Sequence, residues 1–324
     1  MSTANSFAGA MLGSLLLLAL SGCGNDASRS VSLAAQGVYT ASLSNDSQLA
    51  LVGSMNHGAS LWRAGSHERL FSWNHAEGEF STLIATAFSA DGLRAATSDP
   101  RTLVIWDTSS GKDLAFWGLP SAALDIAVAN DGRRVLLGLE DHSAILFDAA
   151  NGSHLHTLLH GGVVGNVDID PNGTLAITGS DDQTARLWDL TTGQQQFELA
   201  HENPVRAVAL SADGRVAFTA SQNQRVRTWD TQTGKPLHLL YKKNPGITSA
   251  RFSDDGSLLL LGLVNRTVEL YRVDSGQRLQ RWRLPSKHGL SGAGSAVLSV
   301  GFDADNRRYF AINGEGELST LVRS

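Results

Sequence analysis

The sequence predicts an all-β fold made of stacked copies of one unit, because it combines a fixed repeat, recurrent turns and short β-type segments. An aromatic residue followed by Asp recurs every 41 residues, at Trp106, Phe147, Trp188 and Trp229. Related endings, Leu61-Trp62 and Leu270-Tyr271, lie 44 residues before and 42 residues after this series. A constant period between 20 and 50 residues is typical of one supersecondary unit that has been copied and stacked.

The clearest copy spans residues 163–199 and contains four short β-type runs separated by polar turns. Short runs that are broken by Gly, Asn and Asp indicate antiparallel hairpins. No stretch of the expected mature chain, from residue 23 on, shows the sustained apolar period of 3.6 that would predict a long helix. We therefore expect four antiparallel strands in each unit.

Two series of turn residues recur along the chain and support this division. The first turn of the unit holds Asp91-Gly92, Asp131-Gly132, Asn172-Gly173, Asp213-Gly214 and Asp255-Gly256. These residue types tolerate the positive φ that tight hairpin turns require. A second glycine series follows the aromatic endings, at Gly65, Gly111, Gly152, Gly193, Gly234 and Gly276.

Residues 178–189, with the sequence Thr-Gly-Ser-Asp-Asp-Gln-Thr-Ala-Arg-Leu-Trp-Asp, resemble the WD-repeat β-propeller family. Members of this family often place a His before the first strand, where this chain has His75, His160 and His201. The resemblance implies a buried hydrogen-bond network within a blade. Carried over to two units, the network consists of His160, Ser180, Asp182 and Trp188, and of His201, Ser221 and Trp229.

The match is weaker in other units. Asn223 stands at the Asp position of the unit that ends at Trp229. The units that end at Phe147 and Tyr271 lack both the His and the Trp.

Six units end near residues 62, 106, 147, 188, 229 and 271, and a seventh starts at residue 297 and supplies only three strands. The resemblance implies that an N-terminal strand, Val31 to Ala35, completes this last blade and closes the ring. Residues 31–324 give 42 residues for each of seven blades, in agreement with the repeat. The expected fold is an all-β, seven-bladed WD-repeat β-propeller with four antiparallel strands per blade.

Residues 1–22 are expected to form a signal peptide. They carry no charged side chain, and the apolar stretch from Ala10 to Leu20 is shorter than the roughly 20 residues that a membrane span needs. Leu20-Ser21-Gly22-Cys23 resembles the bacterial lipobox, which implies cleavage before Cys23, diacylglycerol on its sulfur and an acyl chain such as palmitate on its amine. The segment before the apolar core has no Lys or Arg, which departs from the pattern. An ordinary signal peptide with a chance cysteine, or a cryptic anchor, is the alternative.

The expected organisation is a signal peptide at 1–22, a lipidated tether at 23–30 and a single propeller at 31–324. Cys23 is the only cysteine, so no intrachain disulfide is expected. In a host with two membranes, Gly24 after the cysteine favours the outer membrane, and the protein would face the periplasm. The tether reaches about 25–30 Å at most, which would hold the propeller close to the membrane.

Composition and motifs suggest no chemistry of catalysis. The 26 basic and 31 acidic residues give a net charge of −5 without the basic stripe typical of nucleic-acid binding. Residues 168–173 match half of a calcium loop, but Gly179 stands where its bidentate Glu belongs. His154 and His156 could share one face of a strand, yet zinc would need further ligands. We expect no catalytic site, no metal and no cofactor.

The resemblance also places two loop types on one rim: those between successive blades, and those between the second and third strands of a blade. Function concentrates on loops that a rigid scaffold holds, and the longest one spans residues 285–295. The candidate partner-binding rim residues are Trp73, His75, Tyr241, Lys242, Lys243, Lys287 and His288. For Trp73, packing between blades is the alternative role.

The leading hypothesis is a monomeric, non-catalytic, lipid-anchored scaffold of the bacterial cell envelope. It would bind an envelope protein or peptide through this rim and the membrane through the lipid on Cys23. One alternative is an envelope enzyme, or a binder of small ligands or glycans, that uses the central channel. Another, by analogy of fold alone, is a factor of outer-membrane protein assembly.

Overall fold

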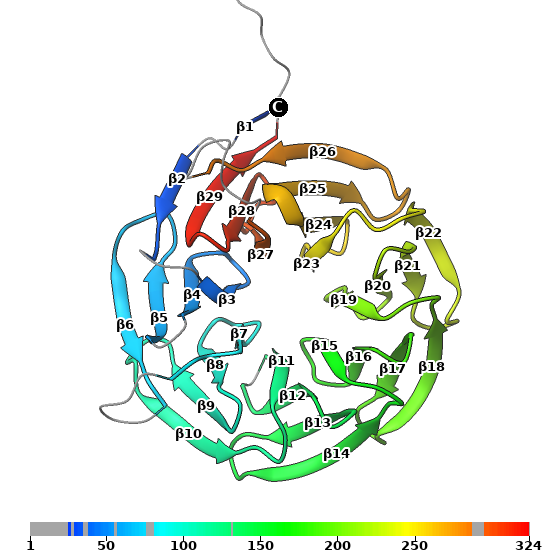
Figure 1. The fold of residues 1–324 in the computed structure, drawn as a ribbon, viewed down its shortest axis with the longest axis horizontal. Coiled ribbons are helices and arrows are strands. Elements are labelled where there is room, and N and C mark those ends of the chain that lie inside the picture. Colours follow the sequence, from blue (N-terminus) through cyan, green and yellow to red (C-terminus); the bar gives the residue numbers. More distant parts are fainter. Residues whose placement is uncertain are drawn as a thin grey trace, which may run out of the picture.

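Seven antiparallel sheets surround a central channel like the blades of a propeller (Figure 1). The computed structural model describes residues 25–26, 29–34, 38–54, 57–75, 81–130, 132–286 and 295–323. The predicted all-β, seven-bladed propeller with four antiparallel strands per blade is confirmed. Within these ranges the one helix is a short 3₁₀ turn, Val264–Arg266, and no helix is long and apolar enough to cross a membrane.

The first four blades follow the chain from the innermost to the outermost strand. Blade 1 consists of β3 (Val38–Leu43), β4 (Leu49–Ser54), β5 (Gly58–Arg63) and β6 (Arg69–Trp73). Blade 2 consists of β7 (Ala85–Phe88), β8 (Arg94–Ser98), β9 (Thr102–Asp107) and β10 (Asp113–Gly118). Blade 3 consists of β11 (Ala123–Val128), β12 (Arg134–Leu139), β13 (Ser143–Asp148) and β14 (Ser153–Leu159). Blade 4 consists of β15 (Val164–Ile169), β16 (Leu175–Ser180), β17 (Thr184–Asp189) and β18 (Gln194–Ala200).

The last three blades include the strands that close the ring. Blade 5 consists of β19 (Val205–Leu210), β20 (Val216–Ser221), β21 (Val226–Asp230) and β22 (Pro236–Tyr241). Blade 6 consists of β23 (Ile247–Phe252), β24 (Leu258–Leu263), β25 (Thr267–Arg272) and β26 (Arg278–Arg283), with β1 (Asn25–Asp26) at its outer edge. Blade 7 consists of β27 (Val297–Phe302), β28 (Arg308–Asn313), β29 (Glu317–Val322) and the N-terminal β2 (Arg29–Ser32).

The ring closes where the two ends of the chain meet, as the blue and red strands of Figure 1 show. β2 pairs antiparallel with β29, with Val31 opposite Leu318, and the Leu33 N–H donates to the Gly316 carbonyl at 2.8 Å. This confirms the expected closure by an N-terminal strand, which begins two residues earlier than predicted. Ala35, the expected end of that strand, lies outside the described residues.

The segment that was expected to form the tether includes β1, which pairs in parallel with β26. Asn25 lies opposite Trp282, and Asp26 lies opposite Arg283. Backbone pairing along the wall of blade 6 therefore begins two residues after Cys23.

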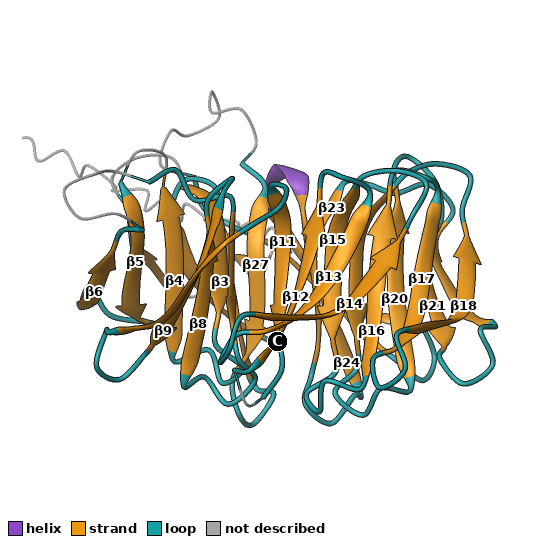
Figure 2. Cartoon of the chain, turned by 90° about the horizontal axis from the view of Figure 1, so that it is seen from below, coloured by secondary structure: helices purple, strands orange, loops and turns teal. Residues whose placement is uncertain are grey.

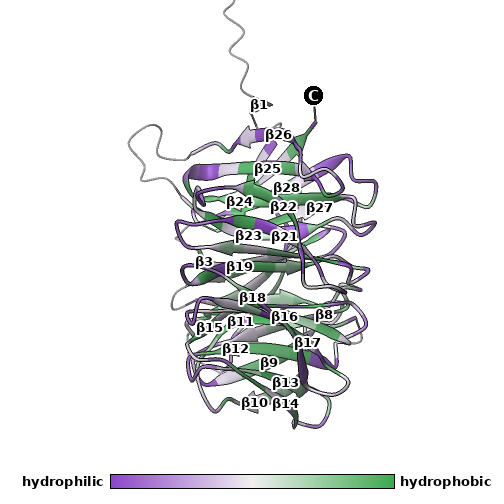
Figure 3. Cartoon of the chain, turned by 90° about the vertical axis from the view of Figure 1, so that its right-hand side faces the viewer, coloured by the Kyte–Doolittle hydropathy of each residue, from purple (hydrophilic) through white to green (hydrophobic). Residues whose placement is uncertain are grey.

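The core is divided among the gaps between blades. Seven apolar clusters are buried, and each combines residues of two adjacent blades. The closing cluster, for example, joins Val31 and Phe310 of blade 7 to Leu43 and Val52 of blade 1. Figure 3 shows the strands mostly as apolar and the turns as hydrophilic, and Figure 2 shows the turns gathered on two rims.

The second glycine series makes part of the contact between neighbouring blades. Gly152 has a φ of 76°, and a Cβ there would lie 2.6 Å from the Trp117 ring of the preceding blade. A Cβ at Gly193 would likewise lie 2.5 Å from the His156 ring. A side chain at either position would collide with the ring, so these glycines serve both the turn and the packing.

Candidate functional site at the loop rim and central channel

Blade 4 contains a buried hydrogen-bond network that runs from the rim to the middle of the sheet. His160 Nδ1 lies 3.0 Å from Asp182 Oδ2, and His160 Nε2 lies 2.7 Å from Thr178 Oγ1. The Trp188 indole N–H donates to the same Thr178 hydroxyl at 2.8 Å. The structure therefore brings together three of the four expected residues, with Thr178 as the central hydroxyl.

Ser180 does not occupy the position that the family resemblance gave it. Its hydroxyl donates to the Gly162 carbonyl at 3.0 Å and accepts from the Asp182 N–H at 3.1 Å. The register explains the difference, because Trp188 lies opposite Ala176. Thr178 is the diagonal neighbour on that face, while Ser180 lies about 7 Å further along the strand.

Blade 2 repeats this network around His75, which was expected to contact a partner. His75 Nε2 lies 2.8 Å from Thr97 Oγ1, the group that also accepts from the Trp106 indole at 2.9 Å. His75 Nδ1 lies 2.6 Å from Thr102 Oγ1 and 3.3 Å from Asp99 Oδ2. With its side chain 3% exposed, His75 is part of the blade and not of a binding surface.

In blade 5 the network is incomplete. The Trp229 indole donates to Thr219 Oγ1 at 2.7 Å, whereas Ser221, which was expected there, donates to the Asn203 carbonyl at 2.9 Å. The His201 ring meets the Trp229 ring edge-on at 5.8 Å, but its buried Nε2 has no hydrogen-bond partner.

Burial lowers the pKa of all three histidines. In blades 2 and 4 the neighbouring carboxylate, Asp99 or Asp182, opposes this shift. His201 has no such carboxylate. Burial and the nearby charge of Arg227 therefore lower the pKa of His201 to about 4.

Two further rim candidates, Trp73 and Tyr241, are structural. Trp73 is 3% exposed, stacks on Trp106 with 4.9 Å between the ring centroids, and donates to the Gly111 carbonyl at 2.9 Å. This is packing between blades 1 and 2. Tyr241 donates its hydroxyl to the carboxylate of Glu269, which is buried in blade 6.

The sequence reasoning missed Glu269 as the centre of this second network. Glu269 also accepts from the Tyr271 hydroxyl at 2.9 Å and from Arg278 at 3.1 Å. Tyr271 takes the place of the Trp in this blade, and its acceptor lies two residues before it, as Ser60 does for Trp62 at 2.8 Å. The spacing of two residues between the aromatic residue and its acceptor was the sequence signal that pointed to Glu269.

Lys242 and Lys243 are the expected rim residues that lie exposed, in the loop between β22 and β23. Lys287 and His288 lie outside the described residues, as does most of the 285–295 loop.

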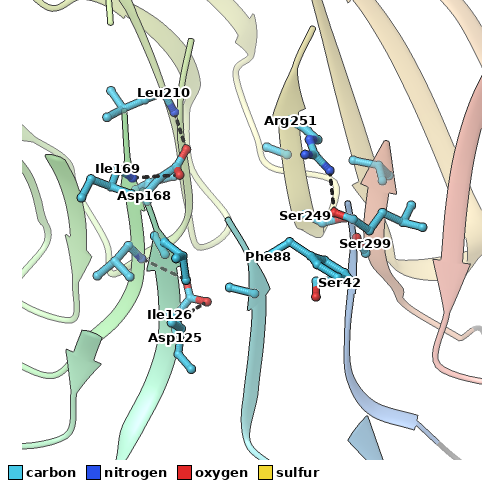
Figure 4. Close-up of a pocket in the computed structure, with 18 of the residues that line it drawn as sticks. Ser42, Phe88, Asp125, Ile126, Asp168, Ile169, Leu210, Ser249, Arg251 and Ser299 are labelled. Carbon is cyan, nitrogen blue, oxygen red and sulfur yellow. Dashed lines mark hydrogen bonds between the residues drawn. The ribbon is translucent and has the colours of Figure 1, made fainter. Parts of the chain in front are cut away.

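The central channel contains a cavity of about 330 Å³ between the innermost strands. In the close-up of Figure 4, Asp125 and Asp168 lie on one side, and Arg251 lies across from them. Asp125 accepts from the N–H groups of Ile126 at 3.0 Å and Val167 at 2.9 Å. Asp168 likewise accepts from Ile169 at 2.9 Å and from Leu210, on the next blade, at 2.7 Å.

Arg251 forms a third link between blades in the channel. Its guanidinium donates to the Leu43 carbonyl at 2.9 Å and to Asn45 Oδ1 at 2.7 Å, so it reaches from blade 6 to blade 1. The innermost strand of every blade is a sheet edge, and its unpaired backbone groups need partners. The channel charges supply such partners.

Burial raises the pKa of Asp125 to about 7 and that of Asp168 to about 6, although backbone N–H donors oppose the shift. Both side chains are partly exposed, but only to the channel cavity, which the innermost strands surround. Dehydration of the ionised form outweighs the hydrogen bonds in each case.

Among the described residues, no group of three or more His, Cys, Asp or Glu side chains is placed to hold a metal ion. His154 Nε2 instead lies 3.0 Å from Thr157 Oγ1 and 3.1 Å from the His156 carbonyl.

Two family models match parts of the chain. The model of the WD domain, G-beta repeat, matches residues 152–189 and 193–230, which cover most of blades 4 and 5. The model described as outer membrane protein assembly factor BamB matches residues 47–169. No curated protein matches the chain. The chain is therefore a seven-bladed propeller with WD repeats and a region similar to BamB.

We predict that Thr178→Val destabilises the protein because it leaves the Trp188 indole and His160 Nε2 without a partner. The expected loss in free energy of unfolding is about 1–3 kcal/mol for each unpaired group, measured by urea denaturation. Thr228→Val is the matched control, because the Thr228 hydroxyl is buried without a partner. Equal losses in the two variants would contradict the central role of Thr178.

The raised pKa of Asp125 predicts that stability depends on pH. Because the folded-state pKa, about 7, exceeds the ordinary value of 3.8, protonation stabilises the folded protein. This contribution is full below about pH 4 and is lost as the pH rises through 7. The difference in melting temperature between the protein and Asp125→Asn should therefore change between pH 5 and pH 8. A difference that stays constant over that range would contradict the raised pKa of Asp125.

Proposed function

We propose that the protein is a lipid-anchored, non-catalytic scaffold of the bacterial cell envelope that binds a partner protein or peptide through the rim of inter-blade loops. One observation carries this proposal: Asp125, Asp168 and Arg251 in the channel are bonded to other blades, whereas rim residues such as Lys242 and Lys243 extend into solvent. The channel charges thus hold the ring together, which favours a scaffold over an enzyme. The rim is the surface on which side chains remain available to a partner.

The N-terminus supports an anchored form of this scaffold. The Leu-Ser-Gly-Cys sequence at residues 20–23 resembles a lipobox, and Cys23 itself lies outside the described residues. β1 begins at Asn25 and runs along β26. A lipid on Cys23 would therefore hold blade 6 close to the membrane, at the outer membrane on its periplasmic side.

A role in assembly of outer-membrane proteins is the second candidate. The match of residues 47–169 to the model of that assembly factor favours it. In that case the partner of the scaffold would belong to the machinery that assembles outer-membrane proteins, and the rim would remain the contact surface.

The anchor predicts that cells incorporate a fatty-acid probe into the full chain at Cys23, because the mature sulfur and amine would both carry acyl groups. The measurement is in-gel detection of a clickable palmitate analogue. Cys23→Ala should abolish the label, and Ser21→Ala, which keeps the cysteine, should retain it. Unchanged labelling of Cys23→Ala would refute lipidation at this residue.

The rim predicts a contact that depends on position. A photo-crosslinking amino acid at Lys242 should give a discrete adduct in intact cells, identified by mass spectrometry. The same group at Lys112, in an exposed turn on the opposite rim, is the control and should give none. Identical adducts from both positions would show that the rim has no special role.

A further inference from the structure

Three blades place a His before their first strand, but one of them lacks the carboxylate that the others provide. Asp99 faces His75 in blade 2, and Asp182 faces His160 in blade 4. Blade 5 has Asn223 at the equivalent sequence position, 41 residues after Asp182.

In blade 4, Oδ2 of the Asp182 carboxylate faces three donors, while Oδ1 accepts from the N–H and the hydroxyl of Thr184 at 2.9 and 2.7 Å. His160 Nδ1 lies at 3.0 Å, the Gly161 N–H donates at 2.8 Å, and Arg186 Nη2 lies at 3.5 Å. The same three places in blade 5 hold His201, the backbone of Glu202, and Arg227, which stands two residues before its Trp as Arg186 does. The donor positions are kept while the acceptor is lost.

The turn between β20 and β21 explains why Asn223 does not replace Asp182 as the acceptor in blade 5. Asn223 itself has the positive φ, 55°, and its side chain is exposed. In blade 4 the positive φ of 71° falls one residue later, at Gln183, which leaves Asp182 free to face its His. A cavity of about 190 Å³ results, lined by Ala200, His201, Glu202, Gln224, Arg225 and Arg227.

The charges around this cavity are unbalanced. His201 Nε2, the counterpart of the His160 nitrogen that contacts Thr178, has no partner, so the His201 ring lacks a hydrogen bond that holds His160. Arg227 lies over the Trp229 ring at 5.5 Å from its centroid. Arg225 donates to Glu202 at 2.6 Å, and both side chains are about half exposed at 46% and 53%. Two guanidinium groups and an imidazole therefore face a single carboxylate, which Arg225 already holds.

We propose that this cavity on the loop rim binds one carboxylate of a partner, presented by an acidic side chain or by a chain terminus. The inference rests on the proposed function, because it names the chemistry by which that rim would recognise its partner. The bound carboxylate takes the place that Asp182 fills in blade 4. It accepts charge-assisted hydrogen bonds from Arg227 and from Nδ1 of His201, the counterpart of the His160 nitrogen that faces Asp182, and it orients the His201 ring.

The site selects against other groups by charge. A cation would be repelled by Arg225 and Arg227, and an uncharged amide would leave the positive charges uncompensated. Burial and Arg227 hold the pKa of His201 down, so a carboxylate in the cavity should raise that pKa toward its ordinary value of 6.5.

The test uses the purified propeller and short peptides that differ only in whether they carry one carboxylate. One peptide carries a single internal Asp with both ends blocked, a second carries Asn instead, and a third carries Asn with a free C-terminal carboxylate. Binding is followed by NMR of the His201 ring during a pH titration. The Asp peptide, the free-terminus peptide, or both should raise the His201 pKa, and the blocked Asn peptide should not. The stronger of the two carboxylate peptides identifies the source.

Matched variants separate a binding role from a structural one. Arg227→Gln should weaken binding of the carboxylate peptide about tenfold, since a charged hydrogen bond is lost. Arg186→Gln changes the same position of blade 4, where Asp182 already fills the site, and should leave affinity unchanged. Glu202→Gln frees Arg225 and removes a competing carboxylate, so it should tighten binding several-fold.

Equal binding of the Asp and blocked Asn peptides, or equal loss in the Arg227 and Arg186 variants, would overturn the proposal. The outcome is separable from that of the proposed function. If no peptide binds but Lys242 still crosslinks to one partner, the carboxylate site is wrong and the scaffold stands. If the peptides bind and no partner crosslinks, the carboxylate site stands and the scaffold proposal is wrong.

Discussion

Every blade buries its faces against neighbours, so the apolar surface of all seven blades is covered only in a closed ring. The seven apolar clusters each belong to two blades, and none belongs to a single blade. The pairing of β2 with β29 completes blade 7, and the closing cluster between blades 7 and 1 depends on it. Val31 and Leu33 carry it, and both are nearly fully buried. A repeat protein without such closure would need capping units at its ends.

Closure also determines how the channel is used. Seven innermost strands present their edges to one small space, and backbone N–H groups there require partners away from bulk water. Asp125 and Asp168 each bond to the strand of the following blade, and Arg251 reaches over blade 7 to blade 1. The raised pKa values of the two carboxyls reflect the cost of placing such links at the centre of the molecule. The charged lining is thus a consequence of the architecture.

The sequence predicted the ring because its period and turn residues follow directly from backbone geometry. Gly173 and Gly214, in the predicted turns, have φ values of 67° and 69°. Details that depend on register were out of reach, since Thr178 and Ser180 point to the same face and only the pairing of Trp188 distinguishes them. The role of Trp73 stayed open at the sequence level, because a large aromatic residue on an outer strand gives the same pattern whether it packs between blades or contacts a partner. The cavity beside His201 left a trace, Asn223 in place of Asp, but its meaning depends on a backbone conformation.

Departures from the repeat fall into two kinds, and the distinction bears on function. Blade 6 lacks the His and the Trp, yet Glu269 with Tyr241, Tyr271 and Arg278 rebuilds a closed set of hydrogen bonds. Its polar groups are satisfied internally, which is the usual condition of a buried network that serves stability. Blade 5 also departs, but nothing in the described chain replaces the lost carboxylate, so His201 and Arg227 keep their places without the acceptor that Asp182 provides in blade 4. A partly buried positive charge without a compensating carboxylate lowers stability unless something outside the chain supplies one. Since the gap opens on the loop rim, a partner is the natural source of the missing group.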